Sequence, residues 1–323
     1  GLLTHGFATD GHGRKMSKSL GNTVEPQTVS NKMGAEIVRL WVASTDYSGD
    51  LNIDDKILAR VVDTYRRVRN TLKFLLDNIS DFDYSKDAVA PENMLEIDRY
   101  ALSRVAQLQK DILAHYQIYE FHPAVHKLQV YCSEDLGAFY LDILKDRLYT
   151  TKANSLERRS AQTALWTITH AMLRWMAPFL SFTAEEAWGI VGTSESIFMD
   201  AYVDLTAPDE TLLAKWARIR SVREAVNKEI ETLRAAGQIG ASLQAEVTVT
   251  LPPEDYAALS DCGMDAKFVF IVSAIQLVAG DALAISVTAT NGTKCERCWH
   301  YTHDIGSNEK HPTLCGRCAS NLE

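Results

Sequence analysis

Four cysteines near the end of the chain have the residue type and spacing of a metal site. Cys295 and Cys298 form one Cys-x2-Cys pair, and Cys315 and Cys318 form a second pair after sixteen intervening residues. Each pair can turn two thiolates toward one ion, and two pairs complete the tetrahedron that zinc prefers. Because four protein ligands leave no open position for a reactive water, we expect one structural zinc ion.

Two disulfides, four free thiols, or a histidine in place of one cysteine are the alternatives at this site. The nearby histidines are His300, His303 and His311. A complete set of four soft thiolates favours zinc with cysteine ligands over these alternatives. The other two cysteines, Cys132 and Cys262, are isolated. This usage suits a reducing compartment, so we expect the cytoplasm.

The second candidate site is the run Lys15-Met16-Ser17-Lys18-Ser19, inside a glycine-flanked loop from Asp10 to Gly21. Ammonium groups can bind phosphate as point charges. Two lysines do not define a site by themselves, and on composition alone a solvated basic loop is the default. The two serines have no recognisable base partner, so we expect them to shape the loop rather than act as nucleophiles.

Most of the elements that must position these residues are predicted to be helices. Apolar residues recur at spacings of three and four over residues 56–79, 100–116, 123–148, 155–176 and 211–236. Pro123 suits a first helical residue, and Pro178 ends the fourth segment. Thr183 and Glu186 have capping-box spacing, which predicts a short helix through Trp188.

Strand patterns occur near the two ends. Residues 1–55 mix short apolar runs with glycine and proline, which is typical of the tail of an α/β unit. Apolar and polar residues alternate over 245–251 and again over 283–287, so residues 241–290 are predicted to form a small α+β unit. The longest apolar stretch, 268–280, contains polar residues and is too short to span a membrane.

Charge is distributed unevenly. The net charge of -9 excludes bulk electrostatic attraction to nucleic acid, so any such binding must use local patches. Residues 56–79 hold six Lys or Arg and two Asp or Glu, a local charge of +4, and form the clearest basic face. Residues 291–323 hold four Lys or Arg and four Asp or Glu. This segment can therefore make specific contacts with nucleic acid, but it does not bind it through an excess of positive charge.

The lysine loop and the helices together resemble a known family. Lys15–Ser19, continued by Leu20-Gly21-Asn22, resembles the KMSKS signature of class I aminoacyl-tRNA synthetases. Three stretches resemble the helical anticodon-binding domain of these enzymes. They are the helix from Lys56, which contains Tyr65-Arg66-Arg67-Val68-Arg69-Asn70-Thr71, and residues 135–149 and 177–188. The resemblance covers nearly the whole chain.

The cysteine-rich ending resembles the isoleucyl branch of this class, of the bacterial or organellar type. Lys294–Trp299 and Leu314–Cys318 look like the zinc module that ends those enzymes. Valyl and leucyl relatives share the loop and the bundle but usually lack this ending, and methionyl relatives carry zinc in the catalytic half. The alternative of an equivalent part of a valyl, leucyl or methionyl enzyme is therefore less favoured.

The resemblance implies a mainly α fold with four parts. Residues 1–55 would be the end of an α/β Rossmann-type catalytic domain carrying the KMSKS loop. Residues 56–205 would be the helical anticodon-binding bundle, 206–290 a small α+β junction domain, and 291–323 a zinc ribbon.

The resemblance also implies an activity: ATP-dependent activation of isoleucine and transfer to tRNA(Ile), with magnesium accompanying ATP. Lys15–Ser19 would bind ATP, with Lys18 contacting the phosphates, where charge grows in the transition state, and Lys15 in support. Trp299 could stack on a base. The candidate tRNA contacts are Arg66, Arg67, Arg69, Lys73, Arg297, Trp299 and Arg317.

The chain departs from the family in one respect, because it contains no His-x-Gly-His element and has no room for an amino-acid pocket before Lys15. We therefore expect a C-terminal portion that is inactive alone, and a monomer. The alternative is a non-catalytic tRNA-binding or scaffold protein in which the lysine loop is a relic.

Overall fold

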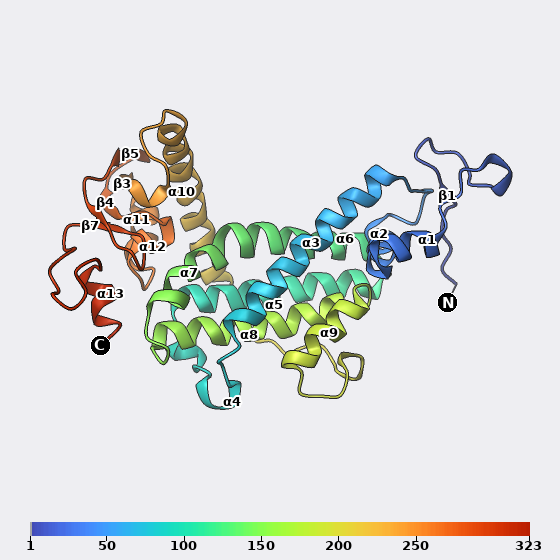
Figure 1. Cartoon of the computed structure of the whole chain (residues 1–323), viewed down its shortest axis with the longest axis horizontal. Helices are drawn as coiled ribbons and strands as arrows, with labels where there is room; N and C mark the ends of the chain where they lie inside the picture. Colours follow the sequence, from blue (N-terminus) through green and yellow to red (C-terminus); the bar gives the residue numbers. More distant parts are fainter. Residues whose placement is uncertain (1) are drawn as a thin grey trace. The chain divides into compact units, whose positions relative to one another are not determined.

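The computed structural model describes residues 2–323, which form two compact units, each assembled from separated stretches of chain. The first unit contains the chain up to Asp81 together with Val105–Phe139 and Leu165–Thr206. The second contains Phe82–Arg104, Tyr140–Ala164 and Ala207–Glu323. Two borders fall inside long helices, so helices α5 (Glu96–Gln117) and α8 (Leu156–Met176) contribute residues to both units (Figure 1).

The first unit carries the lysine loop and most of the long helices. Two short strands, β1 (Ala8–Thr9) and β2 (Leu51–Asn52), pair in parallel. The other elements of this unit are η1 (Lys18–Leu20), α1 (Pro26–Met33), α2 (Ala35–Ser44), α3 (Asp55–Asn78), α6 (Phe121–Val130), the π-helical segment η3 (Tyr131–Tyr140, whose last residue lies past the border), α9 (Ser181–Val191) and η4 (Ile197–Met199).

The second unit contains a small sheet, a long helix and the cysteine-rich end. Its helical elements are α4 (Tyr84–Asp87), η2 (Pro91–Asn93), α7 (Leu141–Thr150), α10 (Glu210–Ala235), η5 (Ser242–Gln244), α11 (Pro253–Ser260), α12 (Ala266–Phe270) and α13 (Gly316–Ser320). Its strands are β3 (Ala245–Leu251), β4 (Ala274–Ala279), β5 (Ala284–Ala289), β6 (Thr293–Lys294) and β7 (Tyr301–Thr302).

Helix α3 lies where the apolar periodicity predicts a helix. Asp54 caps its first turn, because the carboxylate accepts the backbone N–H of Ile57 at 2.7 Å. Leu58, Val68 and Leu75 are buried on its inner face. Since this face packs against α2, α6 and α9, the opposite, basic face stays in solvent.

The segment predicted as one helix over 123–148 is helical from 121 to 150, but it is not a regular α-helix. It begins at Phe121, so Pro123 is the third helical residue rather than the first. Residues 131–140 adopt i to i+5 bonding, which separates α6 from α7. Apolar periodicity could not predict this change, because both helix types bury one side of the segment.

The predicted capping box at Thr183 is wrong. Helix α9 begins two residues earlier, at Ser181, and Leu180 supplies no side-chain cap. The Thr183 hydroxyl is buried and lies 3.0 Å from the hydroxyl of Tyr65, while Glu186 pairs with Arg69 of α3. Both side chains thus join α9 to α3, and these tertiary partners replace the local hydrogen bonds that the spacing suggested.

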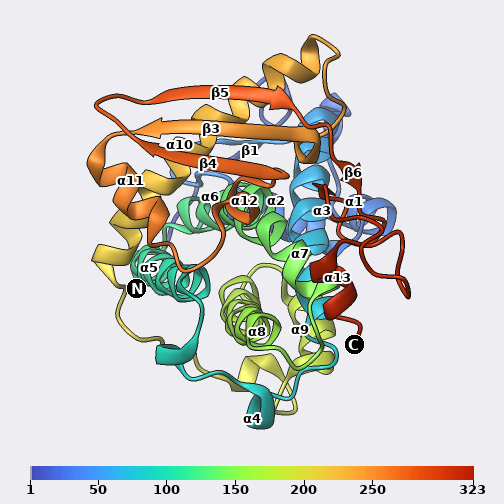
Figure 2. The same cartoon turned by 90° about the vertical axis from the view of Figure 1, so that its left-hand side faces the viewer.

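The second unit contains the three-stranded sheet, in the order β4-β3-β5 (Figure 2). The alternation over 245–251 is confirmed as strand β3, whose alternate side chains are buried. Strand β4 runs parallel to β3, with α11 and α12 in the connection, and β5 runs antiparallel to it. Gly280 fits beside β3 because an added Cβ would come within 2.4 Å of the Thr250 side chain.

No helix among residues 2–323 has the length and apolar character needed to cross a membrane.

Candidate functional site

The lysine loop is held in shape by one carboxylate. Asp10 accepts the backbone N–H groups of His12 at 2.9 Å and Arg14 at 3.0 Å. It also accepts the amide of Asn22 at 3.0 Å, from the far end of the loop. These hydrogen bonds, first that of Asn22, hold the pKa of the Asp10 carboxyl far below its usual range. Asp10 is therefore ionised at neutral pH and ties both ends of the loop together.

The serines of the loop shape its backbone. The Ser17 hydroxyl accepts the N–H of Leu20 at 3.2 Å and so caps η1, which Gly21 ends in the left-handed conformation at φ 64°. The N–H of Ser17 donates to the Asn22 side chain at 2.9 Å. Within residues 2–323, neither the Ser17 nor the Ser19 hydroxyl forms a hydrogen bond with a histidine or a carboxylate that could act as its base, which is consistent with residues that shape the loop.

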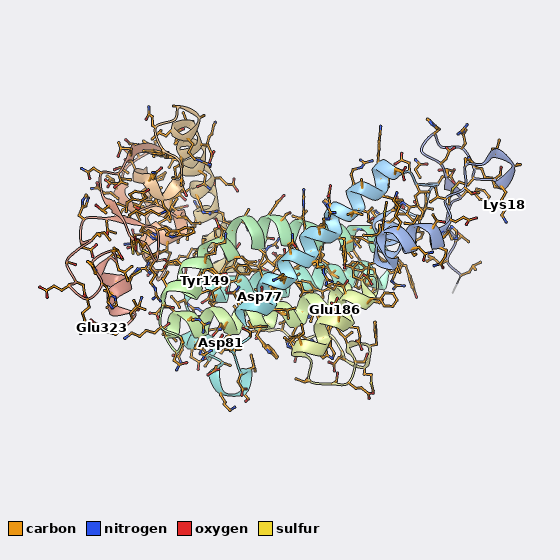
Figure 3. The ribbon with its side chains drawn as sticks, in the orientation of Figure 1. Lys18, Asp77, Asp81, Tyr149, Glu186 and Glu323 are labelled. Atoms are coloured by element: carbon orange, nitrogen blue, oxygen red, sulfur yellow. The ribbon has the colours of Figure 1, made fainter. Side chains whose placement is uncertain are left out.

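The two lysines of the loop have different surroundings. The Lys15 ammonium lies 4.2 Å from the centre of the Phe7 ring, and its backbone forms a bridge with Thr9. Met16 turns inward, where its sulfur accepts the N–H of Val24 at 3.3 Å. Lys18 is exposed on η1 (Figure 3), and no carboxylate of residues 2–323 forms an ion pair with it. Among the described residues neither lysine of the loop has a carboxylate partner, and Lys18 also lacks the ring contact that Lys15 makes, so its exposed ammonium suits an anionic ligand.

The four cysteines form a single cluster in the second unit. The sulfur atoms of Cys295, Cys298, Cys315 and Cys318 all lie within 4.8 Å of one another, and no histidine belongs to the cluster. A tetrahedral zinc ion with Zn–S bonds of about 2.3 Å needs sulfur atoms about 3.8 Å apart. The Cys298 and Cys315 sulfurs are 3.8 Å apart, so the cluster has the dimensions of a zinc site.

The protonation of these thiols also points to a cation. Hydrogen bonding, first from Cys318, lowers the pKa of Cys298. Burial raises the pKa of Cys315 to about 11, and the neighbouring Cys298 raises that of Cys318. Cys298 therefore ionises more readily than Cys315 and Cys318, and a bound divalent cation would offset the charge of neighbouring thiolates.

Two arginines attach the cysteine-rich segment to α7. Arg317 makes two hydrogen bonds of 2.7 Å to the Asp146 carboxylate, and its guanidinium lies 4.9 Å from the centre of the Phe268 ring. Arg297 donates to the carbonyl of Thr150 at 3.3 Å. Arg317 is therefore an internal tie, which favours a structural role for it over the predicted contact with tRNA.

A cavity of about 460 Å³ lies beside this attachment. Its wall includes Tyr149, Phe268 and Trp299, together with Lys145 and Arg297. Trp299 is 60% exposed and has a left-handed backbone at φ 65°, a costly conformation for a bulky residue. The Lys294 ammonium lies 5.1 Å from its ring centre. Exposed aromatic rings beside cations can bind a nucleobase by stacking.

The basic face of α3 is only partly free. Arg69 pairs with Glu186 of α9 at 3.0 Å (Figure 3 labels Glu186), and Lys73 pairs with Asp77 at 3.1 Å. Arg66 lies 3.6 Å from the carboxylate of Asp63. These pairs are exposed, so each contributes about 1 kcal/mol or less and can exchange partners for phosphate.

Three protein families match separate stretches of the chain. They are "tRNA synthetases class I (I, L, M and V)" over residues 1–54, "Anticodon-binding domain of tRNA ligase" over 98–249, and "Zinc finger found in FPG and IleRS" over 292–321. The third family and the geometry of the four cysteines together support zinc as the ion of this cluster.

With these matches, the chain belongs to the class I aminoacyl-tRNA synthetase family. Within the family it is similar over its whole length to isoleucine–tRNA ligases. It is 59% identical to that of Ralstonia pickettii over 100% of the chain, and 59% identical to that of Cupriavidus pinatubonensis over 99%. The chain spans 34% of the length of each of these relatives, so it corresponds to about one third of them.

A solved structure supports the fold. The methionyl-tRNA synthetase of Mycobacterium tuberculosis in complex with methionyl-adenylate superposes with a TM-score of 0.50 at 18% identity, over 62% of this chain and 40% of that one.

Three residues of the site are not among the predicted site residues. Asp10 and Asn22 hold the loop, and Tyr149 lines the cavity (Figure 3 labels it). The Asp-Gly pair at 10–11 is a turn signal that could have indicated the anchor. Tyr149 had no such signal, because an aromatic residue at a helix end is usually part of the core.

Proposed function

We propose that the chain is the C-terminal portion of an isoleucine–tRNA ligase, which activates isoleucine with ATP and transfers it to tRNA(Ile). The proposal includes a division of the chain into four parts. These are the end of a catalytic domain (1–55), an anticodon-binding bundle (56–205), a junction domain (206–290) and a zinc module (291–323). The observation that carries it is the match to isoleucine–tRNA ligases along the entire chain, including the zinc module. A non-catalytic scaffold is less favoured, because Lys18 stands unpaired on a loop that is already ordered.

In this function the lysine loop binds the phosphates of ATP, which magnesium accompanies. As the carboxylate of isoleucine attacks the α-phosphorus, negative charge grows on the phosphate oxygens. A positioned ammonium stabilises that charge without rearrangement, and Lys18 is the free one. Lys15 supports it at the base of the loop, and Ser17 keeps η1 in place.

The tRNA contacts follow from charge and exposure. Arg66, Arg67, Arg69 and Lys73 form an exposed cationic stripe on α3 that can meet phosphates. Arg297 and Trp299 border the cavity beside the zinc module, where an unstacked base could lie against Trp299. Zinc would be held by Cys295, Cys298, Cys315 and Cys318, and it would fix the fold of this module without taking part in the chemistry. We place the ligase in the cytoplasm, as a monomer.

The test uses the complete ligase that contains this chain. Lys18→Ala should slow isoleucine-dependent ATP–pyrophosphate exchange by about two orders of magnitude, because one electrostatic donor is lost from the transition state. Lys32→Ala is the matched control, since Lys32 is an exposed lysine on the next helix, α1, and its loss should leave the rate unchanged. An equal rate in both variants would remove Lys18 from this role. A wild-type ligase that activates no isoleucine would refute the function.

A further inference from the structure

Helix α2, which comes directly after α1, carries a buried acidic residue, Glu36, whose side chain meets the start of α9. The Glu36 residue is 8% exposed, and its Oε1 accepts the N–H of Phe182 at 2.8 Å. Phe182 is the second residue of α9, where N–H groups lack partners inside the helix. Burial raises the pKa of the Glu36 carboxyl. Glu36 thus supplies the cap that Leu180 does not, and it does so from another part of the chain.

A basic residue of α2, Arg39, meets the end of α8. Its guanidinium donates to the carbonyl of Phe179 at 3.1 Å, to the carbonyl of Pro178 at 2.9 Å and to the hydroxyl of Ser181 at 2.7 Å. These groups form the corner between α8 and α9. The carboxylate of Glu36 therefore lies at the positive end of one helix, and the guanidinium of Arg39 near the negative end of the other.

A short series of contacts connects α2 to the lysine loop. The indole N–H of Trp41, also on α2, donates to the carbonyl of Asn52 in β2 at 3.1 Å. Strand β2 pairs with β1, and the Thr9 hydroxyl donates to the Asn52 side chain. Thr9 precedes Asp10, the carboxylate that ties the loop. The α8–α9 corner is thus connected to the lysine loop by hydrogen bonds, by helix α2 and by the peptide bond between Thr9 and Asp10, all within the first unit.

We propose that Glu36 and Arg39 are positioning residues that fix the lysine loop to the α8–α9 corner of the helical bundle. Their task is to keep a tRNA bound on the bundle aligned with the adenylate that forms at the loop. This inference rests on the proposed function. The loop keeps its own shape through Asp10 and Asn22. Loss of the Glu36 and Arg39 contacts should therefore leave the activation of isoleucine intact and slow its transfer to tRNA.

The experiment measures the two steps separately in the complete ligase. Arg39→Ala and Glu36→Ala should leave isoleucine-dependent pyrophosphate exchange without tRNA within about threefold of wild type. Single-turnover transfer from preformed adenylate to saturating tRNA should slow about 10- to 100-fold, because a small misalignment of reacting groups has effects of this size. The KM for tRNA should change little, since the binding surface is intact.

Two further variants separate positioning from general stability. Glu36→Gln keeps an oxygen for the N–H of Phe182 and should restore transfer to within about threefold of wild type. Lys127→Ala removes an ion pair between α5 and α6 but none of the hydrogen bonds of Glu36 or Arg39, and both steps should be unaffected. Arg39→Lys, which keeps the charge but loses the forked geometry, should be intermediate and gives a milder test if Arg39→Ala does not fold.

Equal losses in both steps, or no loss of transfer, would overturn the inference. A wild-type enzyme that activates no isoleucine would instead refute the proposed function, so the two failures can be told apart.

Discussion

Asp98→Asn is expected to destabilise the second unit by about 3 to 5 kcal/mol, because it breaks a buried ion pair. The Asp98 side chain has no exposed surface, and that of Arg147 is 6% exposed. The Asp98 carboxylate accepts two bonds from Arg147, at 2.7 and 2.9 Å, and one each from Tyr140 at 2.7 Å and Ser160 at 2.5 Å. Four bonds fill its acceptor sites. An amide replaces one acceptor with a donor and leaves the guanidinium charge uncompensated.

The assay is equilibrium unfolding of this chain in urea, followed by tryptophan fluorescence. With a slope of about 1–3 kcal/mol per molar urea, the midpoint of the transition that includes the second unit should fall by about 1 M or more. Asp111→Asn is the matched control, since Asp111 also lies on α5 and pairs with Lys127, but that pair is partly open to solvent and its loss should cost about 1 kcal/mol. Replacement of both charged partners, Asp98→Leu with Arg147→Met, should restore part of the stability, because it removes the uncompensated charge but leaves the hydroxyls of Tyr140 and Ser160 without this acceptor. Equal shifts for Asp98→Asn and Asp111→Asn would refute the reasoning.

Two further outcomes concern the metal and pH. The purified chain should contain about one zinc per molecule, Cys318→Ser should lose it, and chelation should make residues 291–323 sensitive to protease; a metal-free wild type with an intact module would contradict this. Burial lowers the pKa of His170, which stacks on Trp166, from 6.5 to about 4. As pH decreases, the His170 imidazole takes up a proton in the unfolded chain before it does so in the folded chain. The free energy of unfolding should therefore fall as pH decreases from about 6.5 to about 4. His170→Phe should flatten that part of the urea midpoint's pH dependence, and an unchanged slope would count against it.

The sequence predicted what depends on local pattern. Helix α3 and strand β3 lie where apolar periodicity indicated, because one face of each is buried along its full length. The sulfur atoms of the four cysteines converge, as their spacing suggested. The lysine loop remains a prediction as a site, although its order and the free Lys18 are consistent with it.

The sequence did not predict features that depend on distant partners. Thr183 and Glu186 have the spacing of a capping box, but their bonds go to Tyr65 and Arg69. Nothing in the sequence around Arg317 distinguishes it from the other basic residues predicted to contact tRNA. In the structure it binds the carboxylate of Asp146, which is distant along the chain. Since such pairs form in three dimensions, residue spacing carries no record of them.

The attachment of the zinc module to α7 bears on how such modules can be exchanged between relatives. Arg317 needs the carboxylate of Asp146, and Arg297 needs the carbonyl of Thr150 at the end of the same helix. A graft of residues 291–323 alone would leave two cations without their partners. The transferable piece is therefore discontinuous, and a chimaera has to carry 141–150 together with the cysteine-rich segment.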